Sequence, residues 1–554
     1  MQVYIVITGG VVSGLGKGIT TASIGKILQA KGFKVTAIKI DPYINYDAGT
    51  LRPTEHGEVW VTEDGGEIDQ DLGHYERFLD TTLTKDHNIT TGQVYYQVIM
   101  NERAGKYLGK TVETIPHVTD EVKRRIRKIA EKTKADFILV EIGGTVGEYQ
   151  NLIYYEAMRQ MKLEGEKVIF VHVTYMPVLK HLGEPKTKPT QHSVKELRAL
   201  GIQPDFIVVR SEVPVDEPRR KKISLFCNVN EEDIISDPDV DLIYEIPLIF
   251  EEQDFGNKIL KKVGLEPRES NLEEWEKFVN KLKNAKESVR VGIVGKYFAT
   301  GGFKLPDAYI SVIEAVRHAC AFWGVKPEFA WIDAQEIERD PEKVKELNKC
   351  DGIIVPGGFG STGAEGKILA IKFVRENKIP FLGLCFGLQL AVVEFARNVC
   401  GLKDANSTEI NPNTPHPVID ILPEQKKLLK ECKYGATMRL GAQPAILKEG
   451  SLVWKLYGKR KMVKERHRHR YEVNPAYHEI LQKHGLIFSG ISPDGRLVEF
   501  IELPNHPFFV ATQAHPEFTS RPLRPNPLFV GFIKACIERK HAIRDRKARL
   551  HKSS

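Results

Sequence analysis

The chain has 554 residues, of which 42% are hydrophobic and 28% charged, with a formal net charge of +7. This length allows two or three domains with full cores, and the composition is that of a globular protein. No uninterrupted apolar stretch approaches the roughly 18 to 20 residues that a membrane-spanning helix needs. The N-terminus leads directly into a strand pattern, and the seven cysteines show no metal-like spacing. We therefore expect a cytoplasmic protein without a membrane partner.

The distribution of charge argues against a nucleic-acid partner. Residues 539–554 hold seven Lys or Arg and one Asp, so this tail supplies +6 of the net charge and the remainder is nearly neutral. A basic end of this kind is more often a solvated, disordered tail than a nucleic-acid arm. We therefore predict a disordered tail over residues 541–554.

The first predicted elements form a phosphate-binding loop. Residues 3–7 are typical of a buried strand, residues 22–29 have a helical pattern, and TGGVVSGLGKGITT lies between them. Backbone N–H groups and a helix N-terminus attract a polyphosphate, and a lysine neutralises its terminal charge. The residues that would form the cradle are Ser13, Gly14, Leu15, Gly16, Lys17, Gly18 and Ile19.

The loop departs from the usual P-loop spacing. Five residues rather than four separate Gly10 from Gly16, and Gly18 stands where a hydroxyl residue normally holds magnesium. An unrelated glycine-rich turn is the alternative. If the loop does bind phosphate, its metal ligands must come from elsewhere in the chain.

Two carboxylates are candidates for Mg²⁺ ligands. Glu141 ends a strand predicted over residues 137–140, and Asp71 lies in the motif DQDLGH. Carboxylates at the carboxyl ends of parallel strands point toward the crevice where the phosphate loop lies. Lys39, at the end of a strand predicted over residues 35–38, completes this candidate site. Each acid taken alone would more often be a solvated or capping residue.

A second group of cations and hydroxyls follows. It contains Lys186, Thr187, Lys188, Pro189, Thr190 and Gln191, with Lys222 further along the chain. Such runs are commonly solvated loops. They become a binding surface if the substrate is itself a polyanion.

Three motifs in the second half predict a nucleophilic centre. The predicted strand 351–355 runs into PGGFG, whose N–H groups could receive an oxyanion, and residues 383–389 read GLCFGLQ after the apolar run 379–382. Glycines two residues before and after Cys385 give a nucleophile elbow its room, and a helix N-terminus favours the thiolate. His515 and Glu517 follow another predicted strand at 508–512, so that Glu517 can orient a histidine base. A buried Cys in a tight turn and a surface His-Pro-Glu loop are the alternatives for the separate motifs.

Together these motifs resemble the class I glutamine amidotransferase family, over residues 289–540. The resemblance implies that Cys385, His515 and Glu517 hydrolyse glutamine and release ammonia. It also implies an oxyanion hole from Gly358 and the Phe386 amide, with Gln389, Glu409 and Arg470 around the glutamine.

An ammonia source implies a consumer, and the first half resembles the amidoligase part of the CTP synthase family. The motifs DPYIN at 41–45, DLGHYERF at 71–78 and the segment 186–195 carry this resemblance, as do GATMRLG at 435–441 and ERHRHRYE at 465–472. With the glutaminase half it covers residues 1–540. It implies ATP, UTP and L-glutamine as substrates, Mg²⁺ as cofactor, GTP as an allosteric activator, CTP as a product inhibitor, and a homotetramer.

The same resemblance assigns the nucleotide sites. ATP would contact Ser13 to Ile19, Lys39, Asp71, Arg210 and Val240. UTP and CTP would contact Ser13, Glu148, residues 186–191 and Lys222, and Mg²⁺ would be held by Asp71 and Glu141.

Four positions, at three places in the chain, depart from that family's usual pattern. Gln150 stands where an acid is frequent, which bears on pyrimidine contacts and CTP feedback. Ser361-Thr362 replaces an aromatic residue and an arginine after the oxyanion turn, and Ala104 replaces a common second arginine. The last two changes bear on regulation by GTP.

The alternating strand and helix patterns predict two doubly wound α/β domains with mostly parallel sheets, one P-loop-like and one a class I glutaminase. We expect a synthetase domain at 1–265, a packed linker at 266–288 and a glutaminase domain at 289–540. Two alternatives are another glutamine-dependent ATP amidoligase, such as the cobyric-acid or dethiobiotin relatives, and a P-loop ATPase or filament scaffold with a vestigial glutaminase.

Overall fold

The computed structural model describes residues 2–52, 56–179, 183–296, 299–300, 303–304, 306–421 and 438–553. The chain divides into two compact units. The first comprises Met1–Thr50 and Glu67–Val279, and the second comprises Leu51–Gly66 and Asn280–Ser554. The segment Leu51–Gly66 thus belongs to the second unit, although the first unit surrounds it in sequence.

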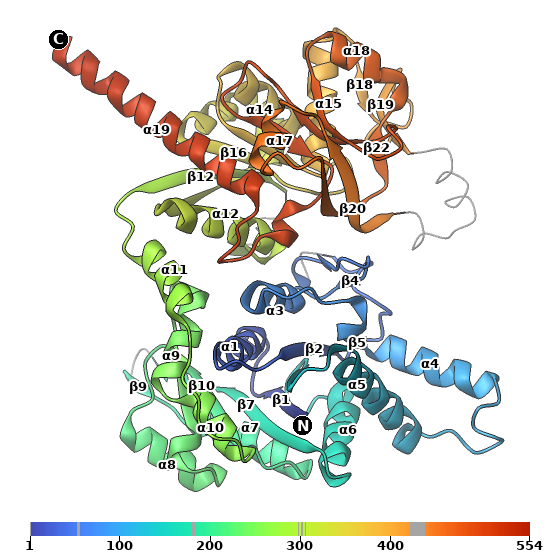
Figure 1. The fold of residues 1–554 in the computed structure, drawn as a ribbon, viewed down its shortest axis with the longest axis vertical. Coiled ribbons are helices and arrows are strands. Elements are labelled where there is room, and N and C mark those ends of the chain that lie inside the picture. Colours follow the sequence, from blue (N-terminus) through green and yellow to red (C-terminus); the bar gives the residue numbers. More distant parts are fainter. Residues whose placement is uncertain are drawn as a thin grey trace. The chain divides into compact units, whose positions relative to one another are not determined.

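The first unit is built on a seven-stranded parallel sheet in the order β11-β10-β7-β1-β6-β2-β5. Every residue of β1, β2 and β6 is buried, as expected for a parallel sheet that helices cover on both faces. Figure 1 shows helices on either side of this sheet. The strands are β1 (Val3–Gly9), β2 (Val35–Asp41), β5 (Asn88–Thr90), β6 (Phe137–Ile142), β7 (Lys167–Tyr175), β10 (Phe206–Ser211) and β11 (Ile234–Pro238), with the short β4 (Glu67–Ile68), β8 (Val178–Leu179) and β9 (Glu184–Pro185).

The helices of this unit connect the strands in the way that parallel pairing requires. One apolar core, formed largely by the sheet with α5 and α6, includes Val122, Ile126, Ile138, Tyr155 and Met158. The helices are α1 (Lys17–Ala30), α3 (Asp71–Leu79), α4 (Thr91–Arg103), α5 (Thr119–Thr133), α6 (Leu152–Leu163), α7 (Lys188–Ala199), α8 (Glu217–Cys227), α9 (Ile246–Glu252), α10 (Phe255–Lys262) and α11 (Glu273–Lys283). Short helical turns lie at Lys85–His87, Thr114–Val118, Tyr149–Asn151, Glu231–Asp233 and Ile243–Glu245.

The second unit has a nine-stranded sheet in the order β15-β12-β16-β17-β25-β24-β23-β20-β21. The strands from β15 to β25 in this order are parallel, and those from β25 to β21 pair antiparallel. Its strands are β12 (Ser288–Gly295), β15 (Lys326–Asp333), β16 (Gly352–Val355), β17 (Phe381–Leu384), β20 (Arg439–Leu447), β21 (Met462–His469), β23 (Ile487–Ile491), β24 (Val498–Glu502) and β25 (Phe509–Thr512). Smaller strands are β3 (Trp60–Val61), β13 (Ala299–Thr300), β14 (Phe303–Lys304), β18 (Ala405–Ser407), β19 (His416–Ile421) and β22 (Tyr471–Val473).

The helices of the second unit pack around the parallel half of its sheet. A continuous core joins β16, β17 and β25 to α14 and α15 through residues such as Ile353, Ile371, Phe381 and Val392. The helices are α12 (Ile310–Trp323), α13 (Ala334–Arg339), α14 (Ala364–Glu376), α15 (Phe386–Asn398), α17 (Leu452–Leu456), α18 (His478–Lys483) and α19 (Pro527–Ser553), with short turns at Pro306–Tyr309, Pro341–Lys349, Pro475–Tyr477 and Pro516–Thr519.

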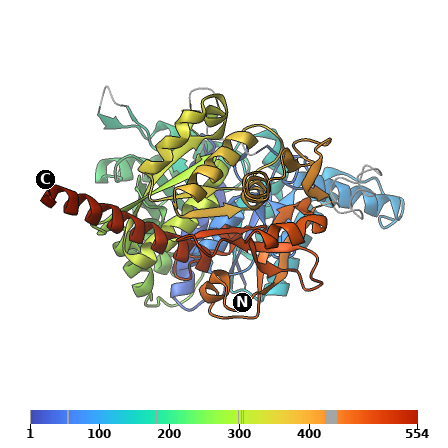
Figure 2. The same ribbon diagram turned by 90° about the horizontal axis from the view of Figure 1, so that it is seen from above.

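The predicted fold class is confirmed, since both units are α/β with mostly parallel sheets. The structure differs from the sequence prediction at the C-terminus. α19 runs from Pro527 to Ser553, so residues expected to form a disordered tail are helical, and Figures 1 and 2 show the end of α19 extending from the second unit. The physical reason is the absence of Gly and Pro after Gly531 and the abundance of Ala, Arg and Lys, which favour helix even where no core is buried.

Across the part of the chain that the structure describes, no helix is both long enough and apolar enough to cross a bilayer.

Candidate active sites in the two units

Cys385 lies in a strained turn between β17 and α15. Its backbone φ of 51° is in the left-handed region, which is costly for a residue other than glycine. The flanking glycines are needed for close packing: a Cβ on Gly387 would lie 2.1 Å from the carbonyl oxygen of Val355, and one on Gly383 would lie 2.8 Å from the Cβ of Ala511. The elbow predicted from GLCFGLQ is therefore the observed geometry.

His515 stands beside the thiol and is held by Glu517. Its Nδ1 lies 2.7 Å from Oε1 of Glu517, and both side chains are buried. Burial disfavours the imidazolium, but the Glu517 carboxylate and the Cys385 sulfur outweigh it and raise the pKa of His515 to about 10. A protonated imidazole beside a cysteine generally favours a thiolate, which is the nucleophilic form of a cysteine side chain.

The glycine-rich turn after β16 lies against this pair. A Cβ on Gly357 would approach Cε1 of His515 to 2.8 Å and the Cβ of Cys385 to 3.7 Å. Phe386 is the first residue of α15, and the N–H of such a residue has no acceptor within its helix. The turn at Gly357 and the first residue of α15 thus both lie beside Cys385, and Gly358 lines the same pocket as Cys385.

A small pocket opens beside the sulfur. It brings together residues that were predicted from separate parts of the sequence, and its lining consists of Gly358, Phe359, Cys385, Gln389, Glu409, His469, Arg470 and Tyr471. Glu409 accepts a hydrogen bond from Gly360 N at 2.7 Å, and burial raises the pKa of its carboxyl. Gln389 donates to the Tyr471 carbonyl at 2.9 Å, which fixes its amide at the pocket wall.

Several contacts of this centre were not predicted. Gln513 Nε2 lies 3.8 Å from Cys385 Sγ, and the Arg468 carbonyl lies 3.7 Å from the same sulfur. His469 and Tyr471 line the pocket although the sequence reading passed over them. Gln513 lies two residues before His515, and its place in that motif was the available signal.

Lys367 is a further residue that the sequence reading missed. Its side chain is fully buried on α14, and its Nζ donates to the Pro356 carbonyl at 3.3 Å. The same nitrogen would lie 3.7 Å from a Cβ on Gly358. Burial, with help from Lys296, lowers the pKa of Lys367 to about 7. The buried amine of Lys367 thus hydrogen-bonds to the backbone of the glycine-rich turn and lies close to Gly358.

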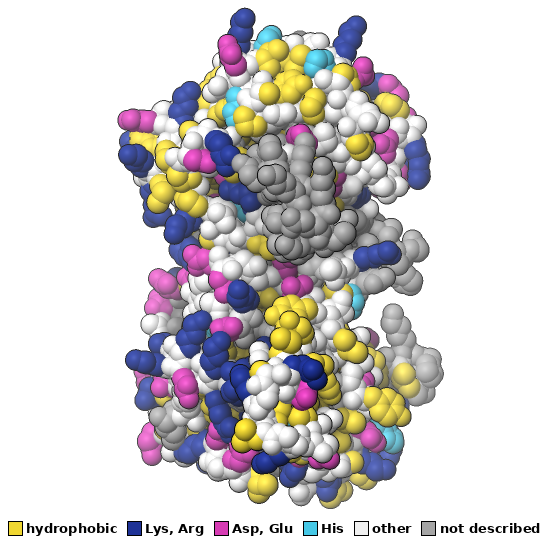
Figure 3. Space-filling view, turned by 90° about the vertical axis from the view of Figure 1, so that its right-hand side faces the viewer, with side chains coloured by type: hydrophobic (Ala, Val, Ile, Leu, Met, Phe, Trp, Pro, Cys, Tyr) yellow, Lys and Arg dark blue, Asp and Glu magenta, His cyan; other side chains and the backbone are white. Residues whose placement is uncertain are grey.

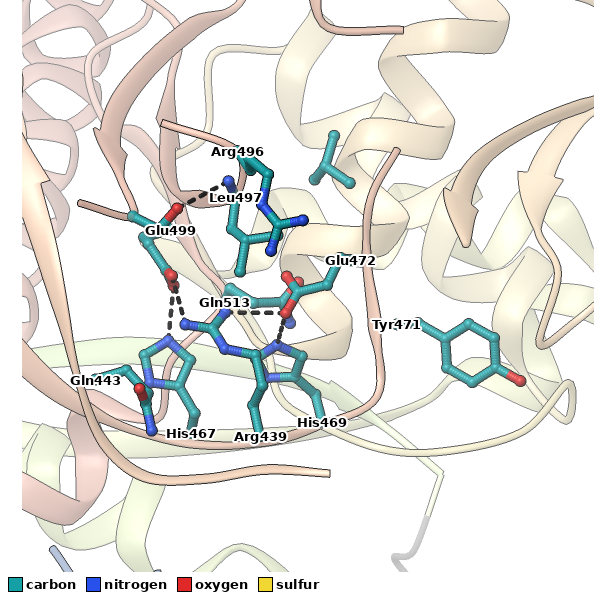
Figure 4. Close-up of polar contacts among 12 residues, drawn as sticks. Arg439, Gln443, His467, His469, Tyr471, Glu472, Arg496, Leu497, Glu499 and Gln513 are labelled. Atoms are coloured by element: carbon teal, nitrogen blue, oxygen red, sulfur yellow. Dashed lines mark hydrogen bonds and ion pairs between the residues drawn. The ribbon is translucent and has the colours of Figure 1, made fainter. Parts of the chain in front are cut away.

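A buried charge network holds together strands on both sides of Arg470, namely β21, which ends at His469, and β22, which begins at Tyr471. Arg439 binds Glu472 at 2.9 Å and Glu499 at 2.8 Å, and these carboxylates in turn bind His469 and His467, each at 2.7 Å (Figure 4). Burial lowers the pKa of His469 and works against the charge on Glu499, but His467 and Arg439 reverse that effect and hold the pKa of Glu499 at about 2. Arg439 is therefore already bound to two carboxylates.

The phosphate loop of the first unit leads from β1 into α1. Gly14 and Gly16 have φ values of 76° and 84°, which glycine adopts without strain. Lys17 is buried, and its Nζ donates to the Gly144 carbonyl at 2.7 Å. Its side chain lies against Gly9, where a Cβ would come within 2.7 Å of Lys17 Cδ.

The glycine at position 18 has a structural explanation. A Cβ there would lie 2.3 Å from Oδ1 of Asp71. The carboxylate of Asp71 therefore occupies the place where a side chain at position 18 would be. A hydroxyl side chain at position 18 would therefore clash with Asp71 of α3.

Four carboxylates surround Lys39 at the end of β2. Its Nζ is hydrogen-bonded to Asp71, lies 3.0 Å from Glu141 Oε1, and lies 3.8 and 3.9 Å from Asp69 and Asp41. Burial opposes the ammonium, but these acids raise the pKa of Lys39 well above its usual value. For Asp71, burial is outweighed by Lys39, His74 and Lys17, and its pKa falls to about 2.

Among the described residues no group of three or more His, Cys, Asp or Glu side chains is arranged to hold a metal by itself. Mg²⁺ is commonly bound by one or two carboxylates together with substrate phosphates. The excess of carboxylates over cations at Asp71 and Glu141 fits such an arrangement.

The residues predicted for the pyrimidine nucleotide lie at three places. Glu148 accepts from Thr145 N and Oγ1 at 2.8 and 2.7 Å and from Gln150 Nε2 at 2.8 Å, so the unusual Gln150 is tied to it. Residues 188–191 form the first turn of α7, Thr187 is its N-cap residue, and Lys186 before it pairs with Glu184 at 2.6 Å.

Lys222 lies on α8, one turn before Phe226, whose ring is 5.6 Å from the Nζ of Lys188. Arg210, in β10, binds Asp237 and Asp239 at 3.2 and 3.0 Å, and Val240 follows these acids. Within the described residues, the hydrogen bonds around Asp71 do not extend to Arg210 or to the lysines of α7 and α8.

Comparison with known proteins decides the family. A family described as CTP synthase N-terminus matches residues 3–265, and glutamine amidotransferase class I matches residues 304–535. The CTP synthase of Pyrococcus abyssi is 59% identical over 98% of this chain and 99% of its own length. The chain belongs to the CTP synthase family.

Other similar proteins include the CTP synthase of Methanopyrus kandleri, which is 57% identical over 96% of this chain and 98% of its own length. Among solved structures, the glutaminase domain of CTPS from Trypanosoma brucei with bound acivicin is 41% identical, with a TM-score of 0.42, over 45% of this chain and 94% of that one.

The buried Lys367 predicts a pH dependence of stability. Because its pKa falls from 10.5 to about 7 on folding, the unfolded chain keeps a proton that the folded chain loses between these values. Lys367 therefore makes stability rise with pH across that window. Lys367→Met should be more stable than the wild type near pH 7, and this advantage should shrink toward pH 10. Thermal unfolding followed from pH 7 to 10 measures the difference.

Taking the difference between the two proteins cancels the opposite contribution of His515, whose raised pKa is a stabilising effect lost at high pH. Lys372→Met, a half-buried lysine on the same helix, is the matched control. If the unfolding temperatures of the wild type and of Lys367→Met changed in parallel from pH 7 to pH 10, this would contradict a lowered pKa for Lys367.

Proposed function

We propose that this protein converts UTP to CTP, with ATP giving ADP and phosphate and glutamine giving glutamate. The observation that carries the proposal is the presence in one chain of a Cys385, His515, Glu517 centre and a Lys17, Lys39, Asp71, Glu141 centre. The match to CTP synthases over nearly the whole chain supports this pairing. It does not favour the alternatives of another amidoligase or of a scaffold with a vestigial glutaminase.

In the glutaminase centre, the Cys385 thiolate attacks the side-chain carbonyl carbon of glutamine. The carbonyl oxygen becomes an oxyanion that accepts hydrogen bonds from the backbone of Gly358 and Phe386. The imidazolium of His515 then donates its proton to the departing nitrogen, so that ammonia leaves and a thioester remains. Glu517 keeps the ring oriented and stabilises its positive charge.

Hydrolysis of the thioester by water completes the glutaminase cycle. Neutral His515 accepts a proton from the water as its oxygen attacks the thioester, and the sulfur leaves as thiolate when glutamate forms. This restores the pair of imidazolium and thiolate that the raised pKa of His515 describes. Glu409 and Arg470, which line the pocket, are suited to hold the ammonium and carboxylate of the substrate's main-chain end.

In the synthetase centre, the oxygen on C4 of UTP attacks the γ-phosphorus of ATP and ADP leaves. Phosphorylation turns a poor leaving group into phosphate, which departs when ammonia adds at C4. Lys17 and Lys39 stabilise the charge on the transferring phosphoryl group. Two triphosphates, each with roughly three to four negative charges, explain why so many cations are needed here.

Mg²⁺ would be held by Asp71 and Glu141 and would neutralise phosphate charge when bound. ATP would lie on the loop Ser13 to Ile19, with Arg210 and Val240 at its other end. The N-terminus of α7 and Lys222 would contact the UTP triphosphate. Glu148 would lie near the pyrimidine, and its bond to Gln150 would alter feedback by CTP.

Ammonia must reach the uracil without becoming ammonium in bulk water, because ammonium is not nucleophilic. We therefore include in the proposal an enclosed path from Cys385 to C4 of UTP. We also include GTP as an activator of glutamine hydrolysis.

A homotetramer is part of the proposal. Tyr96 and Ile99 on α4 are each 56% exposed, and Tyr149 is 95% exposed. Hydrophobic side chains gather on the face of the first unit that carries α4 (Figure 3), and a pocket of about 740 Å³ lies among them. Exposed apolar patches of this kind commonly mark protein interfaces. The free thiols of the described cysteines suit the reducing cytoplasm that we propose as the location.

Replacing the nucleophile should separate the two half-reactions. Cys385→Ala should abolish CTP formation from glutamine, because no other group can form the thioester, and should leave the rate with added ammonium within about twofold. CTP formation is measured by absorbance with either nitrogen source. Loss of both activities in a folded variant would refute the division of labour.

Removing a charged group at the synthetase centre should lower the rate of CTP formation equally with glutamine and with ammonium as nitrogen source. Lys17→Ala and Asp71→Asn should each raise the barrier by about 2 to 4 kcal/mol, since they remove groups that stabilise phosphoryl transfer. Glutamate release from glutamine should survive in both. An equal fall in glutamine hydrolysis would show that the two centres are not separate.

The departure at Thr362 should weaken the response to GTP. Thr362 is exposed, and a hydroxyl binds a phosphate about half as strongly as a guanidinium does. Arg439 is not suited to substitute, because it is bound to Glu472 and Glu499. Lys304 is a second candidate for a substitute cation, and its side chain lies outside the described residues. Glutamine-dependent rates across GTP concentrations should show stronger activation in Thr362→Arg than in the wild type, and an unchanged response would exclude this position as the GTP contact.

A further inference from the structure

Within the segment Leu51–Gly66, the described residues from Glu58 to Glu63 hydrogen-bond to other parts of the second unit. Glu58 accepts from the N–H of Ser311 at 3.1 Å and from its hydroxyl, at the start of α12. The Glu63 carbonyl accepts from Ala442 N at 2.9 Å. Yet the segment lies inside the sequence region that matches the CTP synthase N-terminus.

The backbone contact between this segment and β20 leaves no room for a side chain. Gly441 has a φ of 77°, and a Cβ there would lie 2.6 Å from the Glu63 carbonyl oxygen. Gly65, with a φ of 83°, faces Leu440 in the same contact. Two glycines at one crossing indicate that the segment is held in a defined position.

Trp60 links the segment to His515, the proposed catalytic base, through contacts between aromatic rings. Its side chain is fully buried, and its ring centre lies 4.9 Å from that of Phe518. Phe518 in turn stacks on His515, with ring centres 5.2 Å apart and an angle of 16° between the planes. One face of the imidazole is thus supported by an aromatic pair that ends in Trp60.

A second set of contacts links Val61, the residue after Trp60, to His515. Arg466 donates from Nη1 to the Val61 carbonyl at 2.9 Å, and its guanidinium lies 5.3 Å from the Trp60 ring centre. The carbonyl of Arg466 accepts from the backbone N–H of His515 at 2.7 Å. The segment therefore supports both the ring and the backbone of His515.

We propose that Trp60 and Val61 are positioning residues of the glutaminase reaction. They hold His515 in line with Cys385 through Phe518 and Arg466, although they lie in the synthetase part of the sequence. The inference rests on the proposed glutamine hydrolysis and adds a determinant of that step. An imidazolium that tilts away from the sulfur transfers its proton less well to the departing amide nitrogen, and a displacement of about 1 Å can cost on the order of 100-fold in rate.

The first test separates the two nitrogen sources. In the full-length protein, Trp60→Leu should lower kcat for glutamine hydrolysis by about 10- to 100-fold. KM for glutamine should change by less than about threefold, because the pocket residues are untouched, and CTP formation with ammonium should stay within about twofold. Trp60→Phe retains a ring against Phe518 and should recover most of the lost rate.

A double-mutant cycle tests the route of the effect. If Trp60 acts through Phe518, then Trp60→Leu combined with Phe518→Leu should be about as slow as the slower single variant. Independent contributions would instead multiply. Multiplied losses would overturn the proposed path.

The pH dependence of Cys385 alkylation gives a readout that simple destabilisation does not move. Iodoacetamide modification, followed on the Cys385 peptide by mass spectrometry, reports the thiolate that His515 stabilises. Its midpoint should move up by about one pH unit in Trp60→Leu, because a misaligned imidazolium stabilises the thiolate less. The midpoint should be restored in Trp60→Phe.

Trp275→Leu is the matched control, since Trp275 is buried in the aromatic cluster of the first unit with Tyr244 and Phe278. It should lower the unfolding temperature as Trp60→Leu does, yet leave the alkylation midpoint unchanged. Equal effects of Trp60→Leu on both nitrogen sources, or an unmoved midpoint, would refute the positioning role. A wild type that made CTP from neither nitrogen source would instead refute the proposed function.

Discussion

Parallel strand pairing sets the position of both chemical centres. In the first unit, Lys39 of β2 stands opposite Glu141 of β6, so the ammonium and a carboxylate meet where two strands end. In the second, Leu384 of β17 stands opposite Thr512 of β25, and the next residue, Cys385, donates its N–H to the Thr512 carbonyl at 2.7 Å. A shift of either register by one residue would turn these side chains to the opposite face of the sheet. Everything else at the two sites is arranged around these fixed strand ends.

Once the strand ends place charged groups in buried surroundings, other charges must hold them there. Glu517 keeps His515 protonated against the effect of burial, and four acids do the same for Lys39. Lys367 shows the opposite result: burial lowers its pKa to about 7 and Lys296 adds to the effect. The network of Arg439, Glu472 and Glu499 ties β20, β24 and the start of β22 together beside the pocket at Cys385. Burial and pairing together thus tune reactivity at each centre.

The sequence predicted those parts of the sites that are built from neighbouring residues. The elbow at Cys385, the phosphate loop before Lys17 and the pair His515 and Glu517 each follow a strand pattern, and their glycines have local steric causes. Contacts between distant segments were not predictable from one sequence. Trp60 was not singled out, because its burial depends on Phe518, more than 400 residues later. The helix at residues 541–553 was not predicted, because a run of like charges indicates a solvated tail even where the residues also favour helix.

The central claim is that the two centres act on one nitrogen atom. The most direct test uses glutamine labelled with ¹⁵N in its side-chain amide, turned over with ATP and UTP in the presence of excess unlabelled ammonium. Mass spectrometry of the CTP then reports the source of the amino nitrogen at C4. The account predicts CTP whose label stays close to that of the glutamine at early times, because ammonia passes from Cys385 to the uracil without mixing with solvent. CTP labelled no more than the bulk ammonium pool would contradict it.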